Sequence, residues 1–474
     1  MSMSIRGSHF EEKAQEECGV FGIAAAPTLT DPAISTYQAL YALQHRGQDS
    51  AGIAVCLDGE IVAHKGKGLV PEVFDKKILD GYHGACAAIG HVRQNIDPRR
   101  SGITNVQPLV VYHASGSLAL CYNGKLVNSA ALRSETENRG GIFQGSNDAE
   151  VISYVIVREH LRTDTLADAV LNAMHYLIGA YSFVVMDRNC LIAARDPNGF
   201  RPLCIGEVNG SIVFASESCA IEALGGKFIR DVKPGEVVVT RYGSGEIQSF
   251  ESGIRAKSAL CMFELIYFAR QDSVIDGASI SKVREKAGRC LARKNTVEGD
   301  IVIGVPDSGI AGAMGFARES GIPYGLGLMK NRYIQRTFIE SRAWEREKSV
   351  RIKLNANKPV VKGKRIILVD DSIVRGTTSE RIVQLLRDAG AKEVHFKSTA
   401  PAFSHPCYFG TSLPQQDQLA AYGRTTEEVC KLIGADSLQY LQVEDLAEIA
   451  SDLNIQYCDA CFTGHYAVPV PKQR

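Results

Sequence analysis

Short apolar runs alternate with polar turns through the first half of the chain. The runs GVFGIAAA, GIAVCL, SLALCY, YSFVVM, CLIAAR and SIVFAS are separated by Gly, Asn and Asp, a pattern typical of β-strands. Residues 33–44 and 148–161 instead carry apolar residues at helical spacing. The first half is therefore predicted to consist of sheets covered by helices.

The second half has a different pattern of predicted elements, in which strands and helices alternate. IVIGV precedes GIAGAMGFARES, and RIILV precedes SERIVQLLRDAG and then KEVHFKS. Units of this kind build a mostly parallel, doubly wound α/β sheet. The polar stretch RYGSGEIQSFESGIRAKSA separates these two patterns of predicted elements, so we place a domain boundary near residue 255. The expected domains are residues 18–255 and 256–474.

Composition agrees with a globular chain of more than one domain, since 474 residues are 45% hydrophobic and 22% charged. The 53 basic residues balance 53 acidic ones, so charge favours neither a nucleic acid nor a membrane surface as a partner. No apolar run reaches the roughly 18 residues that a bilayer span requires. Residues 1–17 lack the apolar centre of a signal peptide. Thirteen mostly isolated cysteines favour a reducing compartment, expected to be the cytoplasm.

The segment VDDSIVRGTTS carries the most specific candidate chemistry. Asp370 and Asp371 follow a predicted buried strand at its carboxyl end, where open α/β sheets bind ligands. Two carboxylates there suit a ribose diol or Mg²⁺. When each feature is taken alone, a solvated strand end and a simple N-cap at Ser379 are the favoured explanations, and only the combination is specific. The turn that follows offers hydroxyls and backbone amides at a helix N-terminus, which suits phosphate; its residues are Arg375, Gly376, Thr377, Thr378 and Ser379.

This segment resembles the phosphoribosyl pyrophosphate signature of type I phosphoribosyltransferases. The resemblance implies that the two aspartates hold the ribose hydroxyls and that the turn holds the 5-phosphate. It also implies a pyrophosphate loop after IVIGV, at Asp307, Ser308 and Gly309, with Ser308 sharing Mg²⁺ with the aspartates.

A long basic segment lies between these two elements and is predicted to be a mobile lid. Its cations would neutralise the leaving pyrophosphate as charge develops. A solvated basic loop is the alternative. The candidate residues are Lys330, Arg332, Arg336 and Lys353.

Cys18 stands where the polar leader meets the first predicted strand. Removal of residues 1–17, a predicted propeptide, would place its α-amino group, with a reference pKa of about 8, beside the thiol as a built-in base. The alternative is that Cys18 is a buried structural cysteine and that residues 1–17 are an irregular N-terminal extension.

CGVFGI, LQHRGQDSAGI, GHVR, YNGKLVN and SNDAEVI occur in the order found in N-terminal-nucleophile glutamine amidotransferases. Together with the second half, residues 18–466 resemble the amidophosphoribosyltransferase family. The resemblance implies an αββα glutaminase sandwich followed by a type I phosphoribosyltransferase domain. It implies that glutamine and phosphoribosyl pyrophosphate yield 5-phosphoribosylamine, the committed step of purine synthesis. Homo-oligomers, dimers or tetramers, inhibited by purine nucleotides are implied as well.

The same resemblance assigns roles around the glutamine. Cys18 would attack the amide, and Asn123 with the Gly124 amide would form the oxyanion hole. Arg93 would bind the α-carboxylate of glutamine and Asp148 its α-ammonium group.

The residues around this predicted pocket depart from the family pattern. We expect altered loop closure or altered coupling, because the assigned residues themselves are retained. An ammonia-dependent enzyme without glutaminase activity is one alternative, and a non-catalytic regulator that binds phosphoribosyl pyrophosphate or nucleotides is another. The departures are Gln94, Asn95, Ile96 and Pro98 in the loop after Arg93, and Tyr122, Lys125 and Asn198 elsewhere.

The CDAC motif near the C-terminus is weak evidence by itself, since zinc, redox chemistry and packing are all open. One subgroup of the family holds a [4Fe-4S] cluster, and the resemblance implies a structural cluster here. A zinc site with four cysteines is the alternative. The implied ligands are Cys261, Cys407, Cys458 and Cys461.

Overall fold

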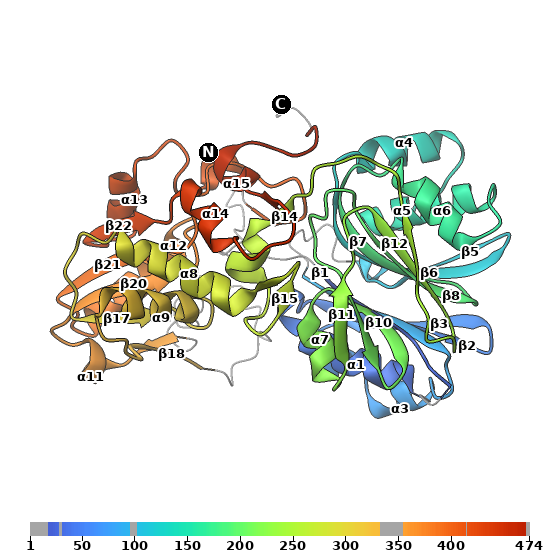
Figure 1. The fold of residues 1–474 in the computed structure, drawn as a ribbon, viewed down its shortest axis with the longest axis horizontal. Helices are drawn as coiled ribbons and strands as arrows, with labels where there is room; N and C mark the ends of the chain where they lie inside the picture. Colours follow the sequence, from blue (N-terminus) through green and yellow to red (C-terminus); the bar gives the residue numbers. More distant parts are fainter. Residues whose placement is uncertain (1–17, 28–30, 95–101, 332–353, 414, 471–474) are drawn as a thin grey trace, which may run out of the picture.

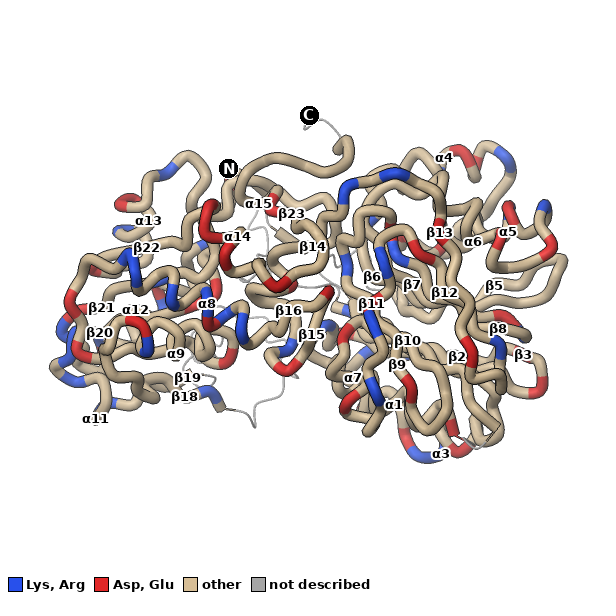
Figure 2. The backbone as a smooth tube through the Cα atoms, viewed as in Figure 1, with Lys and Arg blue, Asp and Glu red and all other residues tan. Residues whose placement is uncertain are grey.

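The computed structural model describes residues 18–27, 31–94, 102–331, 354–413 and 415–470. Two lobes lie side by side, one for each half of the sequence (Figure 1). Basic and acidic residues are interspersed over both lobes (Figure 2). Within the described part of the chain, every helix is too short or too polar to span a bilayer.

Two antiparallel sheets pack face to face in the first lobe. The first sheet has seven strands, in the spatial order β11 (Lys227–Asp231), β9 (Cys204–Val208), β10 (Ser211–Ala215), β1 (Cys18–Ala24), β4 (Ala87–Arg93), β2 (Ser50–Leu57) and β3 (Glu60–Lys67). The second has six, β13 (Gln248–Glu251), β12 (Glu236–Arg241), β8 (Cys190–Arg195), β7 (Gly179–Met186), β6 (Gly116–Leu126) and β5 (Leu109–His113).

Helices cover the outer face of each sheet, which explains why strands such as β1 are apolar on both faces. Val20 packs between the sheets, while its neighbour Phe21 packs under the helices. The first sheet is covered by α1 (Pro32–Ala42), α2 (Val70–Val73) and α7 (Ser218–Ala223), with α3 (Lys76–Asp80) beyond them. The second is covered by α4 (Ser129–Asn138), α5 (Asp148–His160) and α6 (Leu166–Met174). The short helices η1 (Gln44–Arg46) and η3 (Ile103–Asn105) lie in loops.

The second lobe is built on a four-stranded parallel sheet in the order β17 (Ile301–Gly304), β20 (Arg365–Asp370), β21 (Glu393–Ser398) and β22 (Ser437–Tyr440). One face carries α8 (Ile280–Arg293) and α9 (Gly309–Ser320), and the other carries α12 (Thr377–Asp388) and α13 (Thr426–Leu432). The two helices α8 and α9 meet closely at glycines, because a Cβ on Gly288 would lie 1.8 Å from the carbonyl oxygen of Gly312.

Smaller elements complete this lobe. They are β14 (Leu260–Cys261), η4 (Glu264–Phe268), β15 (Val274–Ile275), β16 (Ala278–Ser279), β18 (Leu328–Lys330), β19 (Leu354–Ala356), α11 (Lys358–Val361), η5 (Gln416–Gln418), η6 (Val443–Asp445), α14 (Leu446–Ile449), β23 (Tyr457–Cys458) and α15 (Ala460–Thr463). The predicted fold class, an αββα sandwich followed by a doubly wound α/β domain, is confirmed.

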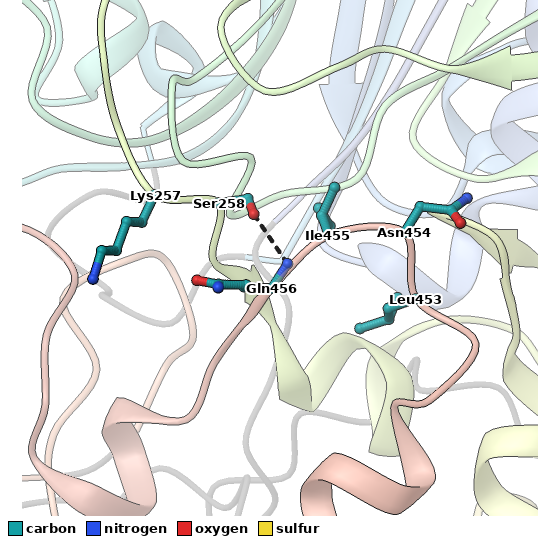
Figure 3. A pocket seen from close by; sticks show the side chains of 6 residues that line it. All are labelled: Lys257, Ser258, Leu453, Asn454, Ile455 and Gln456. Atoms are coloured by element: carbon teal, nitrogen blue, oxygen red, sulfur yellow. Dashed lines mark hydrogen bonds between the residues drawn. The ribbon is translucent and has the colours of Figure 1, made fainter.

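The chain passes between the lobes after β13 and enters the second at β14. A pocket of about 470 Å³ opens beside this connection (Figure 3). The amide of Gln456 donates to the hydroxyl of Ser258 at 3.0 Å in its wall. Neither predicted site contributes a residue to its lining, which consists of Lys257, Ser258, Leu453, Asn454, Ile455 and Gln456.

Candidate functional site

Cys18 begins β1 and is buried, with 5% of its surface exposed. Its backbone pairs with that of Arg93 at the end of β4. Gly47 makes this corner tight, because a Cβ there would lie 2.4 Å from the backbone nitrogen of Arg93. The thiol also lies near Cys121 of β6, whose pKa is raised first by burial and then by the charge on Cys18. Cys18 is therefore held where strands of both sheets meet.

Asn123 and Gly124 lie near the end of β6. Only 1% of Asn123 is exposed, and neither atom of its side-chain amide has a hydrogen-bond partner among the described residues. Such buried orphan atoms are uncommon and point to a ligand. Gly124 has a φ of +139°, and a Cβ there would lie 2.2 Å from the carbonyl oxygen of Ala180. Only glycine fits this backbone.

Arg93 and the start of α5 converge on one backbone carbonyl. The oxygen of Asn105 accepts from Arg93 Nη1 at 2.6 Å and from the amide of Asn147 at 3.2 Å. Asp148 follows Asn147 as the first residue of α5. An arginine and a carboxylate are thus placed at neighbouring positions, an arrangement that suits the two charged groups of an amino acid.

The carboxylate of Asp148 already accepts two hydrogen bonds, from the Leu126 amide at 2.9 Å and the Ser129 hydroxyl at 2.6 Å. The Tyr122 hydroxyl lies 3.5 Å from the same carboxylate and 3.4 Å from the Ala180 carbonyl oxygen. The tyrosine that departs from the family pattern therefore contacts a predicted glutamine ligand.

Gln94 is the one departure in the loop after Arg93 that lies within the described residues. Its amide nitrogen donates to Asp49 at 2.7 Å, and its oxygen accepts from the Gln48 amide at 3.3 Å. It therefore anchors the beginning of the loop to the chain that follows η1. Asn95, Ile96 and Pro98 fall outside the described residues.

In the second lobe, Asp370 and Asp371 lie at the carboxyl end of β20 and are fully buried. The hydroxyl of Ser308 donates to Asp371, so the predicted pyrophosphate loop does meet the acidic pair. Gly309 permits this approach, since a Cβ there would lie 2.5 Å from the carbonyl oxygen of Val369. Oxygen ligands from two strand ends are thus brought together, a donor set that fits Mg²⁺ and a ribose diol.

The turn after the aspartates leads directly into α12, which begins at Thr377. Gly376 precedes it with a φ of +90°, so the helix N-cap is this glycine and not Ser379. The hydroxyl of Thr377 is buried and has no hydrogen-bond partner among the described residues. Arg375 is partly buried and donates to Gln418 at 3.1 Å. A 12-residue helix therefore points its N-terminus at this turn, as phosphate binding requires.

Lys330 of β18 donates to the carboxylate of Asp307 at 2.6 Å, and both side chains are about half exposed. This pair connects the beginning of the predicted lid with the predicted pyrophosphate loop. Arg332, Arg336 and Lys353 lie outside the described residues.

The predicted cluster cysteines also converge. Cys261 and Cys458 are partners in the parallel pair β14 and β23, and Cys461 follows on α15. The pKa of Cys461 is raised well above its usual value, first by burial and then by Cys261, Cys407 and Cys458. Four thiols from three segments therefore face one buried region.

Two features were missed by sequence reasoning. His91 Nε2 lies 3.0 Å from the carbonyl oxygen of Tyr122, beside Asn123, and burial lowers the pKa of this imidazole to about 3. A carbonyl oxygen can only accept a hydrogen bond, so Nε2 carries the proton of a neutral ring.

The second feature that sequence reasoning missed is a buried ionic network around Arg46 and Glu217. Burial opposes the charge on Glu217, yet His45 and Arg46 hold its pKa below the usual range. The glutamate shows no local sequence pattern.

Comparisons with known proteins agree with this geometry. Residues 91–223 match a family described as a glutamine amidotransferase domain, and residues 272–402 match a phosphoribosyl transferase domain. An amidophosphoribosyltransferase of Archaeoglobus fulgidus is 45% identical over 456 residues, which is 96% of this chain and 98% of the relative. One from Bacillus subtilis is 46% identical over 96% of this chain and 95% of its own length.

Solved structures give the same result. B. subtilis glutamine phosphoribosylpyrophosphate amidotransferase, complexed with ADP and GMP, is 44% identical and superposes with a TM-score of 0.87 over 95% of this chain and 97% of that one. A structure of an allosteric regulatory enzyme of purine biosynthesis is 43% identical, with a TM-score of 0.90 over 96% and 97% of the two chains.

Fold and site together define a glutamine amidotransferase joined to a phosphoribosyltransferase. The chain belongs to the amidophosphoribosyltransferase family. Its activity is glutamine-dependent amidotransfer to phosphoribosyl pyrophosphate in purine biosynthesis, which confirms the predicted enzyme class.

Proposed function

We propose that Cys18, freed by removal of residues 1–17, is the nucleophile of the glutaminase half. Its thiol gives its proton to its own α-amino group and attacks the amide carbon of glutamine. Ammonia leaves as the thioester forms, and water then releases glutamate. The buried, unpartnered amide of Asn123 carries this assignment, because it supplies a donor for the developing oxyanion beside the Gly124 amide. Arg93 binds the α-carboxylate of the substrate and Asp148 its α-ammonium group.

In the transferase half, the ammonia displaces pyrophosphate from C1 of phosphoribosyl pyrophosphate, which gives 5-phosphoribosylamine. Asp370 and Asp371 hold the ribose hydroxyls, and Ser308 joins them as a ligand of Mg²⁺, which would neutralise phosphate charge when bound. The turn from Arg375 to Ser379, through Gly376, Thr377 and Thr378, binds the 5-phosphate. Asp307, Ser308 and Gly309 form the pyrophosphate loop, and the positive charges of Lys330 and Arg336 neutralise the leaving pyrophosphate.

Substitution of Asn123 tests the oxyanion assignment. Asn123→Ala should lower glutamine-dependent turnover by about 10²–10³-fold, the usual loss when one oxyanion donor is removed. Ammonia-dependent turnover should stay within twofold of the wild type, because the side chain plays no part in phosphoribosyl transfer. Steady-state assays with each nitrogen source measure the two rates. Equal losses with both nitrogen sources would contradict the assignment.

We propose further that Cys261, Cys407, Cys458 and Cys461 hold a structural [4Fe-4S] cluster. No group of three or more His, Cys, Asp or Glu side chains among the described residues is arranged around one metal ion. Zinc requires thiolates about 2.3 Å from a single ion, whereas a cluster places irons and sulfides between its ligands. The four cysteines are neighbours, since Cys261, Cys407 and Cys458 all raise the pKa of Cys461. The resemblance to the iron-sulfur subgroup supports the cluster over zinc.

Cys458→Ser tests the cluster. Anaerobically purified wild-type protein should contain about four irons and four sulfides per chain, and the variant should lose most of both together with thermal stability. Cys430→Ser, which changes a thiol in α13, is the control and should keep the full iron content. Zinc at one ion per chain, with no sulfide, would overturn the proposal in favour of the alternative.

The solved structures of relatives suggest regulation by nucleotides. The B. subtilis structure contains ADP and GMP, and we propose that purine nucleotides inhibit this chain, which acts as a dimer or tetramer in the cytoplasm. Inhibition curves with AMP, ADP and GMP, and light scattering of the purified enzyme, test these points.

Pyrophosphate release tests the whole assignment, measured anaerobically with Mg²⁺ and phosphoribosyl pyrophosphate and with glutamine or ammonium chloride as nitrogen source. Activity with both sources is expected. Activity with ammonium alone would place a defect in the glutaminase half, and binding without turnover would favour the regulatory alternative.

A further inference from the structure

Glu264 is a fully buried carboxylate supplied by the second lobe to the glutaminase side of the boundary between the lobes. It begins η4, shortly after the chain leaves β14. Its oxygens accept from Arg46 Nη2 at 2.8 Å, Arg46 Nη1 at 3.1 Å and Arg201 Nη1 at 2.9 Å. Both arginines come from the first lobe and have at most 1% of their side-chain surface exposed. One carboxylate thus joins two buried cations.

The first cation leads to the nucleophile. Arg46 Nε donates to the carbonyl oxygen of Cys18 at 3.1 Å. The guanidinium is planar, so its Nη contacts with Glu264 fix the direction of its Nε bond. Arg46 also donates to Glu217 at 2.6 Å, which holds the same group from the side of the first lobe. The backbone of Cys18 is therefore two hydrogen bonds away from Glu264.

The second cation leads to the predicted oxyanion hole. Arg201 Nε donates to the carbonyl oxygen of Phe409 at 3.1 Å, and the rings of Phe200 and Phe409 stack with centroids 4.2 Å apart. The next residue, Gly410, lies directly on Gly124, because a Cβ on Gly410 would be 3.1 Å from the Gly124 carbonyl carbon. Arg201 thereby holds a loop of the second lobe against Gly124.

The segment that begins at Glu264 is itself fixed in the second lobe. Arg284 of α8 donates to the carbonyl oxygens of Leu265, Tyr267 and Ala269 at 2.7 to 3.0 Å. Further along, the side chain of Gln271 donates to the Asp307 carbonyl oxygen at 3.0 Å. The position of Glu264 therefore depends on the transferase half and not on the sandwich alone.

We infer that Glu264 is a positioning residue for glutamine hydrolysis, acting through Arg46 on the backbone of Cys18 and through Arg201 on the loop packed against Gly124. It touches no reacting atom. The inference rests on the proposed roles of Cys18 and Gly124. A displacement of about 1 Å at a reacting group can cost about 10²-fold in rate, so a carboxylate that sets the place of both groups affects glutamine chemistry selectively.

Glu264→Gln tests this role, because it keeps the shape of the side chain and removes its charge. Glutamine-dependent turnover should fall at least about tenfold, as expected from a small misplacement of the nucleophile, mainly in kcat. Ammonia-dependent turnover should remain within twofold of the wild type. Should the variant fail to fold, Glu264→Asp, which keeps the charge at shorter reach, should lower the glutamine-to-ammonia ratio in the same direction.

A second buried ion pair between the lobes provides the matched control. Asp276 accepts from Arg195 Nη1 at 2.9 Å and Nη2 at 2.7 Å. Arg195 donates from Nε to the backbone carbonyl oxygen of Arg201 at 2.8 Å, whereas the guanidinium of Arg201 pairs with Glu264. It has a φ of +45°, which asparagine tolerates. Asp276→Asn should lower the melting temperature as Glu264→Gln does, but leave the glutamine-to-ammonia ratio of turnover at the wild-type value.

The results separate the positioning role from the proposed function. An unchanged ratio in Glu264→Gln, or an equal fall in Asp276→Asn, would overturn the positioning role while leaving the glutaminase assignment intact. A wild-type enzyme without glutamine-dependent turnover, or with full turnover after Cys18→Ala, would overturn the assignment of the nucleophile itself.

Discussion

Asp371→Ala is expected to abolish pyrophosphate release with glutamine and with ammonium alike. Asp371 is fully buried at the carboxyl end of β20, and its carboxylate accepts a hydrogen bond from the hydroxyl of Ser308. Its loss removes a ligand for the ribose diol and Mg²⁺, and leaves the pyrophosphate loop without its partner. We expect a fall of at least about 10³-fold, larger than for one oxyanion donor, because charge neutralisation and positioning fail together.

The control for this variant lies at the opposite edge of the parallel sheet, where β17 and β20 begin. Asp300 directly precedes β17 and forms a solvent-screened ion pair with Arg365, the first residue of β20, and such pairs contribute little to stability. Asp300→Ala should therefore leave turnover within twofold of the wild type. Slow glutamate release should persist in Asp371→Ala, which shows that the first lobe is folded. Substantial pyrophosphate release from Asp371→Ala would remove this aspartate from the substrate site.

Cys18→Ala is expected to eliminate glutamine-dependent turnover while ammonia-dependent turnover stays near the wild-type rate. Loss of a nucleophile removes the covalent route altogether, and such losses reach about 10⁶-fold. Intact mass should show a wild-type protein that starts at Cys18. A wild-type chain that starts at Met1 and still has full glutamine-dependent activity would contradict the N-terminal-nucleophile mechanism.

Cys121→Ala is the matched control, since this thiol is buried close to Cys18 but has no assigned role. It should retain glutamine-dependent turnover within a fewfold of the wild type. A loss equal to that of Cys18→Ala would mean that the region tolerates no change in packing, and the nucleophile would then have to be identified by labelling with a glutamine-like electrophile.

Periodicity predicted many of the strands and helices, whereas the αββα arrangement of the first lobe came from the family resemblance. Predicted strands such as GVFGIAAA and RIILV lie in β1 and β20, and the helical patterns at residues 33–44 and 148–161 correspond to α1 and α5. These elements bury an apolar face, so local sequence records their environment. The parallel pair β14 and β23 was not predicted, because each strand has two residues and its partner lies about two hundred positions away in the chain.

Sequence reasoning likewise found some residues of the candidate site and missed others. Motifs identified Cys18, Asn123 and the aspartate pair, because these residues stand at strand ends in a recognisable order. The contact of Ser308 with Asp371 also follows from the parallel sheet, which places consecutive strand ends together. Glu264 could not be identified in this way. Its arginine partners come from the other domain, and the apolar run around Glu264 carries no information about them.

The carboxylate of Glu264, which binds arginines of the first lobe, also limits how the two domains can be exchanged during evolution or engineering. The boundary near residue 255 is an obvious point for exchanging modules, yet Arg201 and Arg195 pair with the buried carboxylates of Glu264 and Asp276 beyond it. A buried charge that loses its partner destabilises a protein by about 3–5 kcal/mol. A recombinant that joins this glutaminase half to a foreign transferase must therefore inherit residues 256–276 with the sandwich, which moves the workable crossover into the start of the second lobe.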